Sequence, residues 1–280
     1  MIDRLAFDRT TLPNGATAFI RNVEVAFTTV YVMLPVGSAH AGTSTVLSGS
    51  PHFLEHLMCE RTVRNPERCE FERLVGMTGG WTNAHTSLLW TTYELSVPNR
   101  HLAEILPRFC SVVFEPFLLE EDIVQQRGVV SNERQQQRWW PGSTEIGNYM
   151  RTSWQMDDPV SIERTFGDDG DLAGMSVESL GLLHRQYFDP RMKIVAVGPG
   201  NIGPLLGYVS GLELDTKPLK ADFQPVQWIN RDYHEKAFRD SGSYQLNYGA
   251  LFNAAPDPEH MEVTDFILTY LCNSTHGSLY

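Results

Sequence analysis

Two histidines four residues apart, His52 and His56, constrain the fold most, because they can act together only if the segment between them is helical. The surrounding residues predict a helix over about 50–61, with Pro51 suited to its first turn. Both imidazoles would then project from one face and could hold one Zn²⁺ ion. Glu55 would lie on the edge of that face, where its carboxylate can hydrogen-bond a water molecule on the metal without binding the metal itself.

A site with two histidines needs a third protein ligand, and a second helix predicted over residues 119–138 supplies Glu133 as the candidate. Two histidines and a glutamate leave the fourth position of zinc open for water, which is typical of catalytic sites. The order His-x-x-Glu-His is the inverse of the commoner zinc-protease motif, as in the inverzincin group. Cys59 could also approach the metal, although a thiol at such a position is more often a buried apolar residue.

Strand and helix signals alternate through the first two hundred residues and predict an α+β fold, in which helices pack on one face of an antiparallel or mixed sheet. A turn at residues 12–15 separates two short strands. Further strands are expected at about 23–36, 81–87, 89–97, 192–197 and 244–252. Helices are expected at about 66–77, 100–114, 142–154, 176–187 and 259–271, and residues 168–174 predict a loop.

The net charge of −12 argues against a general affinity for nucleic acid or for an anionic membrane. An acidic protein would instead favour basic peptides near its surface. The first ten residues contain no apolar run after a basic cluster and do not predict a signal peptide. The four cysteines form no C-x-x-C pair, so we expect reduced thiols and a cytoplasmic protein.

Six motifs in order carry a resemblance to a known family: LPNG, VGSAHAG, HFLEH, GGWTNAHTS, VVSNE and QYFDPRMKIVAVG. Together they cover roughly residues 10–200, and they resemble the pitrilysin-type (M16) zinc metallopeptidases, which include insulin-degrading enzymes and mitochondrial processing peptidases. The resemblance implies a LuxS/metallohydrolase-like fold. It also implies that His52, His56 and Glu133 bind zinc and that Glu55 is the catalytic base. Asn83 and Ala84 would lie on a sheet edge where an extended substrate adds as a strand.

The sequence departs from the family pattern in two places. Gln126 stands where active members carry another glutamate, so the support for the zinc site from that position would be a neutral hydrogen bond. Family members also repeat the fold, whereas this sequence predicts one complete lobe over residues 1–215, a linker over 216–243 and a short start of a second lobe over 244–280. We therefore expect a second M16-like subunit or a homodimer to complete the binding site, with a truncated product or a single-lobe protein of reduced activity as the alternatives.

Three functions remain open at this point. The first is a zinc endopeptidase, or the catalytic subunit of one, in which Glu55 activates water for hydrolysis of peptides or unfolded protein segments. The second is a non-catalytic M16-like subunit with a structural or peptide-binding role. The third is a different zinc enzyme with the same inverted motif, such as the thioether-cleaving LuxS type. His85, in the NAHTS segment, would contact substrate or lie plainly on the surface.

Overall fold

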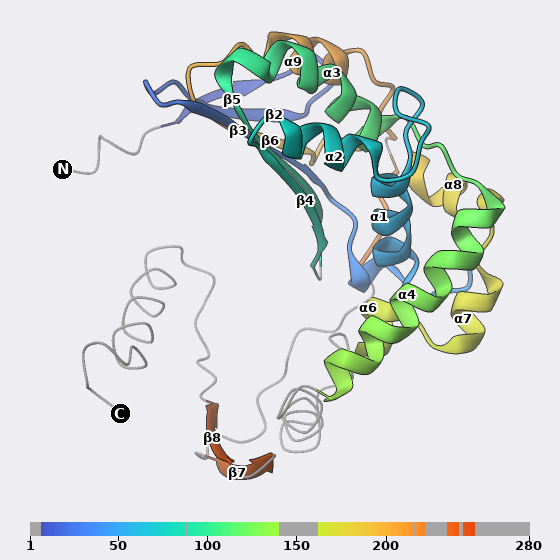
Figure 1. Ribbon diagram of the computed structural model, residues 1–280. Coiled ribbons are helices and arrows are strands. Elements are labelled where there is room, and N and C mark those ends of the chain that lie inside the picture. The colour runs from blue at the N-terminus through green and yellow to red at the C-terminus, as the bar shows by residue number, and fades with distance from the viewer. Residues whose placement is uncertain are drawn as a thin grey trace. The chain divides into compact units, whose positions relative to one another are not determined.

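A six-stranded mixed sheet organises the larger part of the chain (Figure 1). Its strands follow the order β1 (Asp8–Thr11), β2 (Thr17–Arg21), β6 (Lys193–Val197), β3 (Phe27–Leu34), β5 (Thr91–Pro98) and β4 (Trp81–Thr86). Strands β2 and β6 are parallel, and every other neighbouring pair is antiparallel. The mixed sheet expected from the sequence is confirmed.

The computed structural model describes residues 7–87, 89–139, 162–215, 217–221, 234–240 and 243–249. The chain divides into two compact units. The sheet and all the helices described below belong to the first unit. The second contains a hairpin of β7 (His234–Asp240) and β8 (Ser243–Gly249).

Helices pack on one face of the sheet. They are η2 (Ser38–His40), α1 (Ser50–Glu60), α2 (Glu70–Met77), α3 (Asn99–Phe114), α4 (Glu120–Trp139), α6 (Ile162–Phe166), α7 (Asp169–Gly174), α8 (Val177–Arg185) and α9 (Gly203–Ser210). Figure 1 shows α1, α2, α3 and α9 on the same side of the strands. The other side of the sheet carries none of the described helices.

Alternation along β3 explains this one-sided arrangement. Val30, Val32 and Leu34 are fully buried, while the residues between them are partly exposed. Successive side chains of a strand point to opposite faces, so the buried set faces the helices. Leu54 of α1 and Phe109 of α3 are also fully buried in this core. The core therefore fixes the position of α1, the helix that carries the two histidines.

Most elements agree with those predicted. The helix expected at 50–61 is α1, the strands expected at 81–87 and 89–97 are β4 and β5, and the turn at 12–15 joins β1 to β2 as an antiparallel hairpin. The strand expected from residue 23 begins only at Phe27. The helix expected at 142–154 lies outside the described residues.

The loop predicted over residues 168–174 is wrong, because Asp169–Gly174 forms the short helix α7. Asp168 caps its first turn by accepting a hydrogen bond from the backbone N–H of Asp171. The guanidinium of Arg127, on α4, donates to the carbonyls of Leu172 and Met175 at the other end. The acidic and glycine-rich segment is helical because a distant arginine satisfies carbonyls that the helix leaves free.

The predicted domain limits stay a prediction. Strand β8 overlaps the strand expected at 244–252, and β7 falls within residues expected to form a linker. The helix expected near the C-terminus, at 259–271, lies outside the described residues. In the described part of the chain, no helix is both long and apolar enough to cross a membrane.

Gly49 sets the entry into α1. Its φ is +80°, and a Cβ built there would lie 2.5 Å from the backbone nitrogen of Gly167 and 2.5 Å from the carbonyl carbon of Phe166. Only a residue without a side chain allows the segment before α7 to pass this close to the start of α1. Gly49 therefore allows the backbone at Phe166 and Gly167 to pack against the start of α1.

We expect Gly49→Ala to lower the free energy of unfolding by at least about 2 kcal/mol, since a left-handed backbone alone costs an alanine roughly 1–2 kcal/mol and the contact adds to it. Gly181→Ala is the matched control, because Gly181 lies within α8 and a Cβ there meets nothing within 4 Å. That control should gain about 0.5–1 kcal/mol. Urea unfolding followed by circular dichroism measures both, and equal stabilities for the two variants would contradict this account of Gly49.

Candidate metal centre

Helix α1 places polar side chains in a buried position. His52 and Glu55 are each 7% exposed, although the other side chains around them are mainly apolar. Burial of a polar group without partners is unfavourable, so a buried cluster of this kind requires an explanation. The T-shaped contact of the Phe166 ring with His52, at 4.8 Å between ring centroids, closes one side of the cluster with an apolar wall.

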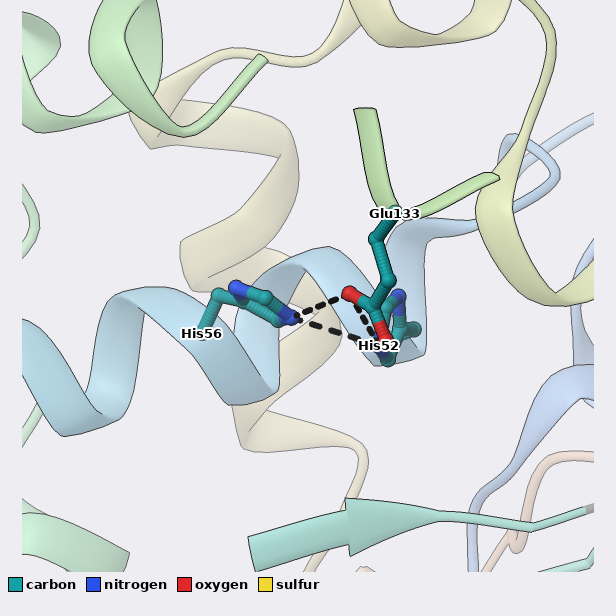
Figure 2. A group of neighbouring side chains, drawn as sticks. All are labelled: His52, His56 and Glu133. Carbon is teal, nitrogen blue, oxygen red and sulfur yellow. Dashed lines mark hydrogen bonds and ion pairs between the residues drawn. The ribbon is translucent and has the colours of Figure 1, made fainter. Parts of the chain in front are cut away.

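Glu133 of α4 reaches the two histidines, as Figure 2 shows. Its Oε2 lies 3.4 Å from Nε2 of His56 and 3.7 Å from Nε2 of His52. The two Nε2 atoms are 3.2 Å apart. The three residues that the sequence suggested as zinc ligands thus converge on one point from two helices.

This donor set fits a zinc ion. Ligand atoms about 2.0–2.2 Å from a tetrahedral zinc lie roughly 3.3–3.6 Å from one another, which matches the separations of the two imidazoles and the carboxylate. Two histidines and a glutamate also match the donor set of catalytic zinc sites. Nδ1 of His52 is buried and has no hydrogen-bond partner among the described residues. The other imidazole, His56, is held from behind by Gln126, whose Oε1 lies 3.1 Å from Nδ1 of His56.

The protein shifts the pKa of each group in the cluster. Burial, followed by the charge of His56, lowers the pKa of His52. Burial also lowers the pKa of His56, but hydrogen bonds and the charges of Glu133 and Glu55 outweigh it, so that the net shift is upward. The hydrogen bond from His56, with the charges of both histidines, lowers the pKa of Glu133 against the effect of burial. Glu133 is therefore held ionised, as a metal ligand must be.

Glu55 lies beside the cluster and is oriented by β4. Oγ1 of Thr86 donates a hydrogen bond of 2.7 Å to Oε2 of Glu55. Burial raises the pKa of Glu55, and the hydrogen bond from Thr86 opposes part of that shift. A carboxylate with a raised pKa accepts a proton more readily at neutral pH than an exposed one, which suits a group that takes up and returns protons.

Strand β4 carries the residues expected to meet substrate. Asn83 is exposed and Ala84 is half-buried. Within the described residues β4 pairs only with β5, so its other edge is open (Figure 1). His85 is also exposed, and its Nδ1 lies 3.0 Å from Oε1 of Glu94 on β5.

A cavity of about 520 Å³ joins the metal cluster to β4. His52, Glu55, His56 and Glu133 line it together with residues 82–86 of β4. Cys59 lines the same cavity and is exposed, but it does not belong to the group of side chains close enough to share a metal ion.

Two residues at the site were not expected from the sequence. Thr86 orients Glu55, and Phe166 packs on His52. Thr86 could have been suspected from its place at the end of the TNAHT strand. Phe166 carries no signal in the sequence, because its contact with His52 depends on how residues 162–166 fold back onto α1.

Comparisons with known proteins point to one family. The sequence model described as Insulinase (Peptidase family M16) matches residues 16–158, just over half of the chain. Zinc protease PqqE of Helicobacter pylori is 28% identical over 172 residues, which cover 60% of this chain and 37% of that protein. The human mitochondrial-processing peptidase subunit alpha is 28% identical over 191 residues, which cover 68% of this chain and 36% of that protein.

Solved structures share the fold. The crystal structure of a protease from Helicobacter pylori aligns with a TM-score of 0.64 at 22% identity, over 81% of this chain and 55% of that one. The first half of the periplasmic protease PqqL from Escherichia coli aligns with a TM-score of 0.64 at 18% identity, over 80% of this chain and 49% of that one. The chain thus matches little more than a third of the length of the two curated relatives named above.

Zinc should stabilise the folded protein if the cluster binds it, because a ligand specific to the folded state adds about 2.7 kcal/mol at one hundred times its Kd. We expect a rise in Tm on addition of Zn²⁺ to chelator-treated protein, and we expect His56→Ala to abolish most of that rise. His101→Ala is the control, since His101 lies on α3 and does not line the cavity. A zinc-dependent rise in Tm that survives in His56→Ala would exclude this cluster as the binding site.

Proposed function

Because this chain belongs to the M16 peptidase family, we propose that it is a zinc-dependent endopeptidase, or the catalytic subunit of one, that hydrolyses peptides or extended protein segments. The convergence of His52, His56 and Glu133 beside the buried carboxylate of Glu55 carries this proposal. The relatives named as zinc proteases support it.

One Zn²⁺ ion held by His52, His56 and Glu133 would supply a Lewis acid that acidifies water and polarises the scissile carbonyl. Glu55 then takes the proton from the attacking water. Thr86 occupies Oε2 of Glu55, which leaves Oε1 free to accept that proton. The raised pKa of Glu55 allows the same carboxyl group to pass the proton to the leaving amine.

The open edge of β4 would hold the substrate backbone. An extended peptide that pairs with residues 82–86 would lie along the cavity that contains Glu55 and the three candidate ligands. Main-chain pairing at Asn83 and Ala84 places few demands on the substrate sequence. It does require an unfolded or flexible segment, which makes peptides and extended protein segments the substrate class.

The cavity favours basic substrates. Among the described residues its lining includes four glutamates and neither lysine nor arginine. Glu60 is paired with Arg68, and the roles proposed above use Glu55 and Glu133. Glu72, on α2, has no ion-pair partner in the described part of the chain and adjoins Phe71, whose buried ring also lines the cavity. A lysine or arginine side chain could lay its stem on the apolar wall and bring its charge to Glu72.

A non-catalytic M16-like subunit is the second candidate, and the neutral Gln126 behind His56 favours it. In either case we propose a second M16-like subunit, or a second copy of this chain, as partner. Relatives named as alpha and beta subunits of a processing peptidase support a partnered assembly. The cytoplasmic location, the LuxS/metallohydrolase-like fold and the start of a second lobe at residues 244–280 stay predictions.

Glu55→Gln separates the two candidate functions. This substitution keeps the shape of the side chain but removes its ability to take a proton, so we expect a loss of at least about 10²-fold in kcat with zinc content unchanged. Fluorogenic peptide cleavage and metal analysis of the purified protein, alone and with a partner subunit, measure both. Stoichiometric zinc in the original protein without cleavage in any pairing would support the non-catalytic candidate. Cleavage by Glu55→Gln at the original rate would contradict the role of Glu55 as the base.

Glu72→Gln should selectively slow the cleavage of basic peptides. An exposed ion pair contributes about 0.2–1 kcal/mol, so we expect kcat/KM to fall up to about fivefold for a peptide with lysine or arginine beside the scissile bond. The corresponding glutamine peptide should be unaffected. Glu70→Gln is the matched control, with the same loss of charge on the same helix but outside the cavity lining. Equal effects of the two substitutions would point to general electrostatics instead of a contact.

A further inference from the structure

A chain of hydrogen bonds continues from His56 away from the candidate metal centre. Nδ1 of His56 meets Oε1 of Gln126 at 3.1 Å, and Nε2 of Gln126 donates to Oε1 of Glu60. Gln126 is 3% exposed, so its amide cannot exchange these partners for water. Glu60 lies four residues after His56 on α1, while Gln126 comes from α4.

Glu60 is itself fixed by Arg68. The guanidinium of Arg68 lies 2.6 Å from Oε2 of Glu60 through one nitrogen and 2.8 Å through another. Arg68 also lies 3.5 Å from the buried carboxylate of Asp122, which receives a 2.9 Å bond from Arg61. Through these ion pairs, Arg68 holds the Glu60 carboxylate in place as an acceptor of hydrogen bonds.

The Glu60 carboxylate, paired with the guanidinium of Arg68, dictates every hydrogen bond between itself and His56. A carboxylate only accepts, so the amide nitrogen of Gln126 must face Glu60. The amide oxygen of Gln126 must then face His56, and an amide oxygen also only accepts. Nδ1 of His56 therefore carries the hydrogen. In the neutral imidazole this leaves Nε2, the atom that faces Glu133, with a free electron pair for a metal ion.

We propose that Glu60 is a positioning residue which, through the amide of Gln126, holds His56 in the tautomer whose Nε2 is unprotonated and faces Glu133. The inference rests on the proposed function, because it assigns the tautomer to zinc binding. It also accounts for the departure at position 126. The negative charge that active family members carry there is present here one hydrogen bond further out, on α1 instead of α4. The neutral Gln126 links His56 to the carboxylate of Glu60 by two hydrogen bonds.

A charge exchange tests this relay. In Glu60→Gln the residue at position 60 can accept or donate, so the orientation of Gln126 is no longer imposed, and we expect zinc affinity to fall about 10–100-fold. Gln126→Glu alone would place two carboxylates in contact and should also weaken zinc binding. The double substitution Glu60→Gln with Gln126→Glu puts a carboxylate directly against Nδ1 of His56, with an amide donor behind it. We expect that variant to recover zinc affinity to within about threefold of the original protein.

The tautomer of His56 gives a readout that does not depend on cleavage. Nitrogen-15 NMR of the full, metal-free chain should show His56 protonated at Nδ1 in the original protein and in the double variant. In Glu60→Gln it should show a mixture of tautomers. Glu67→Gln is the control, since Glu67 is exposed and its side chain has no hydrogen bond to this network. Thermal unfolding of each variant identifies any loss of zinc affinity that results from a failure to fold.

The outcomes separate the two claims. An unchanged His56 tautomer and unchanged zinc affinity in Glu60→Gln would overturn the relay, even if the protein is an active peptidase. Failure of the double variant to recover zinc affinity, with its fold intact, would also overturn it. Absence of cleavage in every pairing would instead overturn the proposed function, while the tautomer and zinc measurements would still decide the relay.

Discussion

Two helices of this protein meet through polar side chains in the interior, where folded proteins ordinarily place apolar ones. Helix α1 brings His52 and Glu55 into the interior, and α4 brings Glu133 to meet them. Desolvation makes such a cluster unfavourable unless each group has a partner or a metal ion is bound. The surrounding structure meets part of that demand, with Thr86 on Glu55 and Gln126 on His56, whereas Nδ1 of His52 has no hydrogen-bond partner among the described residues.

Ion pairs next to the metal cluster join α1 to α4. Arg61 and Arg68 follow α1 and bind the carboxylates of Asp122 and Glu60, so that the two helices are joined by charges as well as by the metal cluster. Glu133 lies about two turns along α4 from Gln126, on the same face. The same helix therefore carries a candidate ligand and the group that orients the ligand opposite it. A rigid joint of this kind keeps donor atoms in position before any ion arrives, which reduces the cost of ordering them on binding.

The sequence predicted the local features of the site, because they depend on spacing along one helix. The interval between His52 and His56 requires a helix, and α1 begins at Ser50 as expected. Contacts across the fold could not be predicted in this way. The insertion of β6 between β2 and β3 depends on pairing across more than 150 residues, and the helix α7 depends on arginines of α4. The bond of Gln126 to Glu60 belongs to the same class, since neither residue identifies the other in the sequence.

The face of α4 turned toward α7 constrains how this protein can change during evolution. Arg127 follows Gln126, and Arg134 follows Glu133, and each of these two arginines binds the segment around α7. Seven residues make nearly two whole turns, which keeps both arginines in register. Insertion or deletion of one residue between the two arginines would rotate one relative to the other by about 100°, so that both sets of contacts could no longer form at the same time. Val129, between the two arginines, is exposed, so the constraint falls on the length of this segment and not on the identity of that side chain.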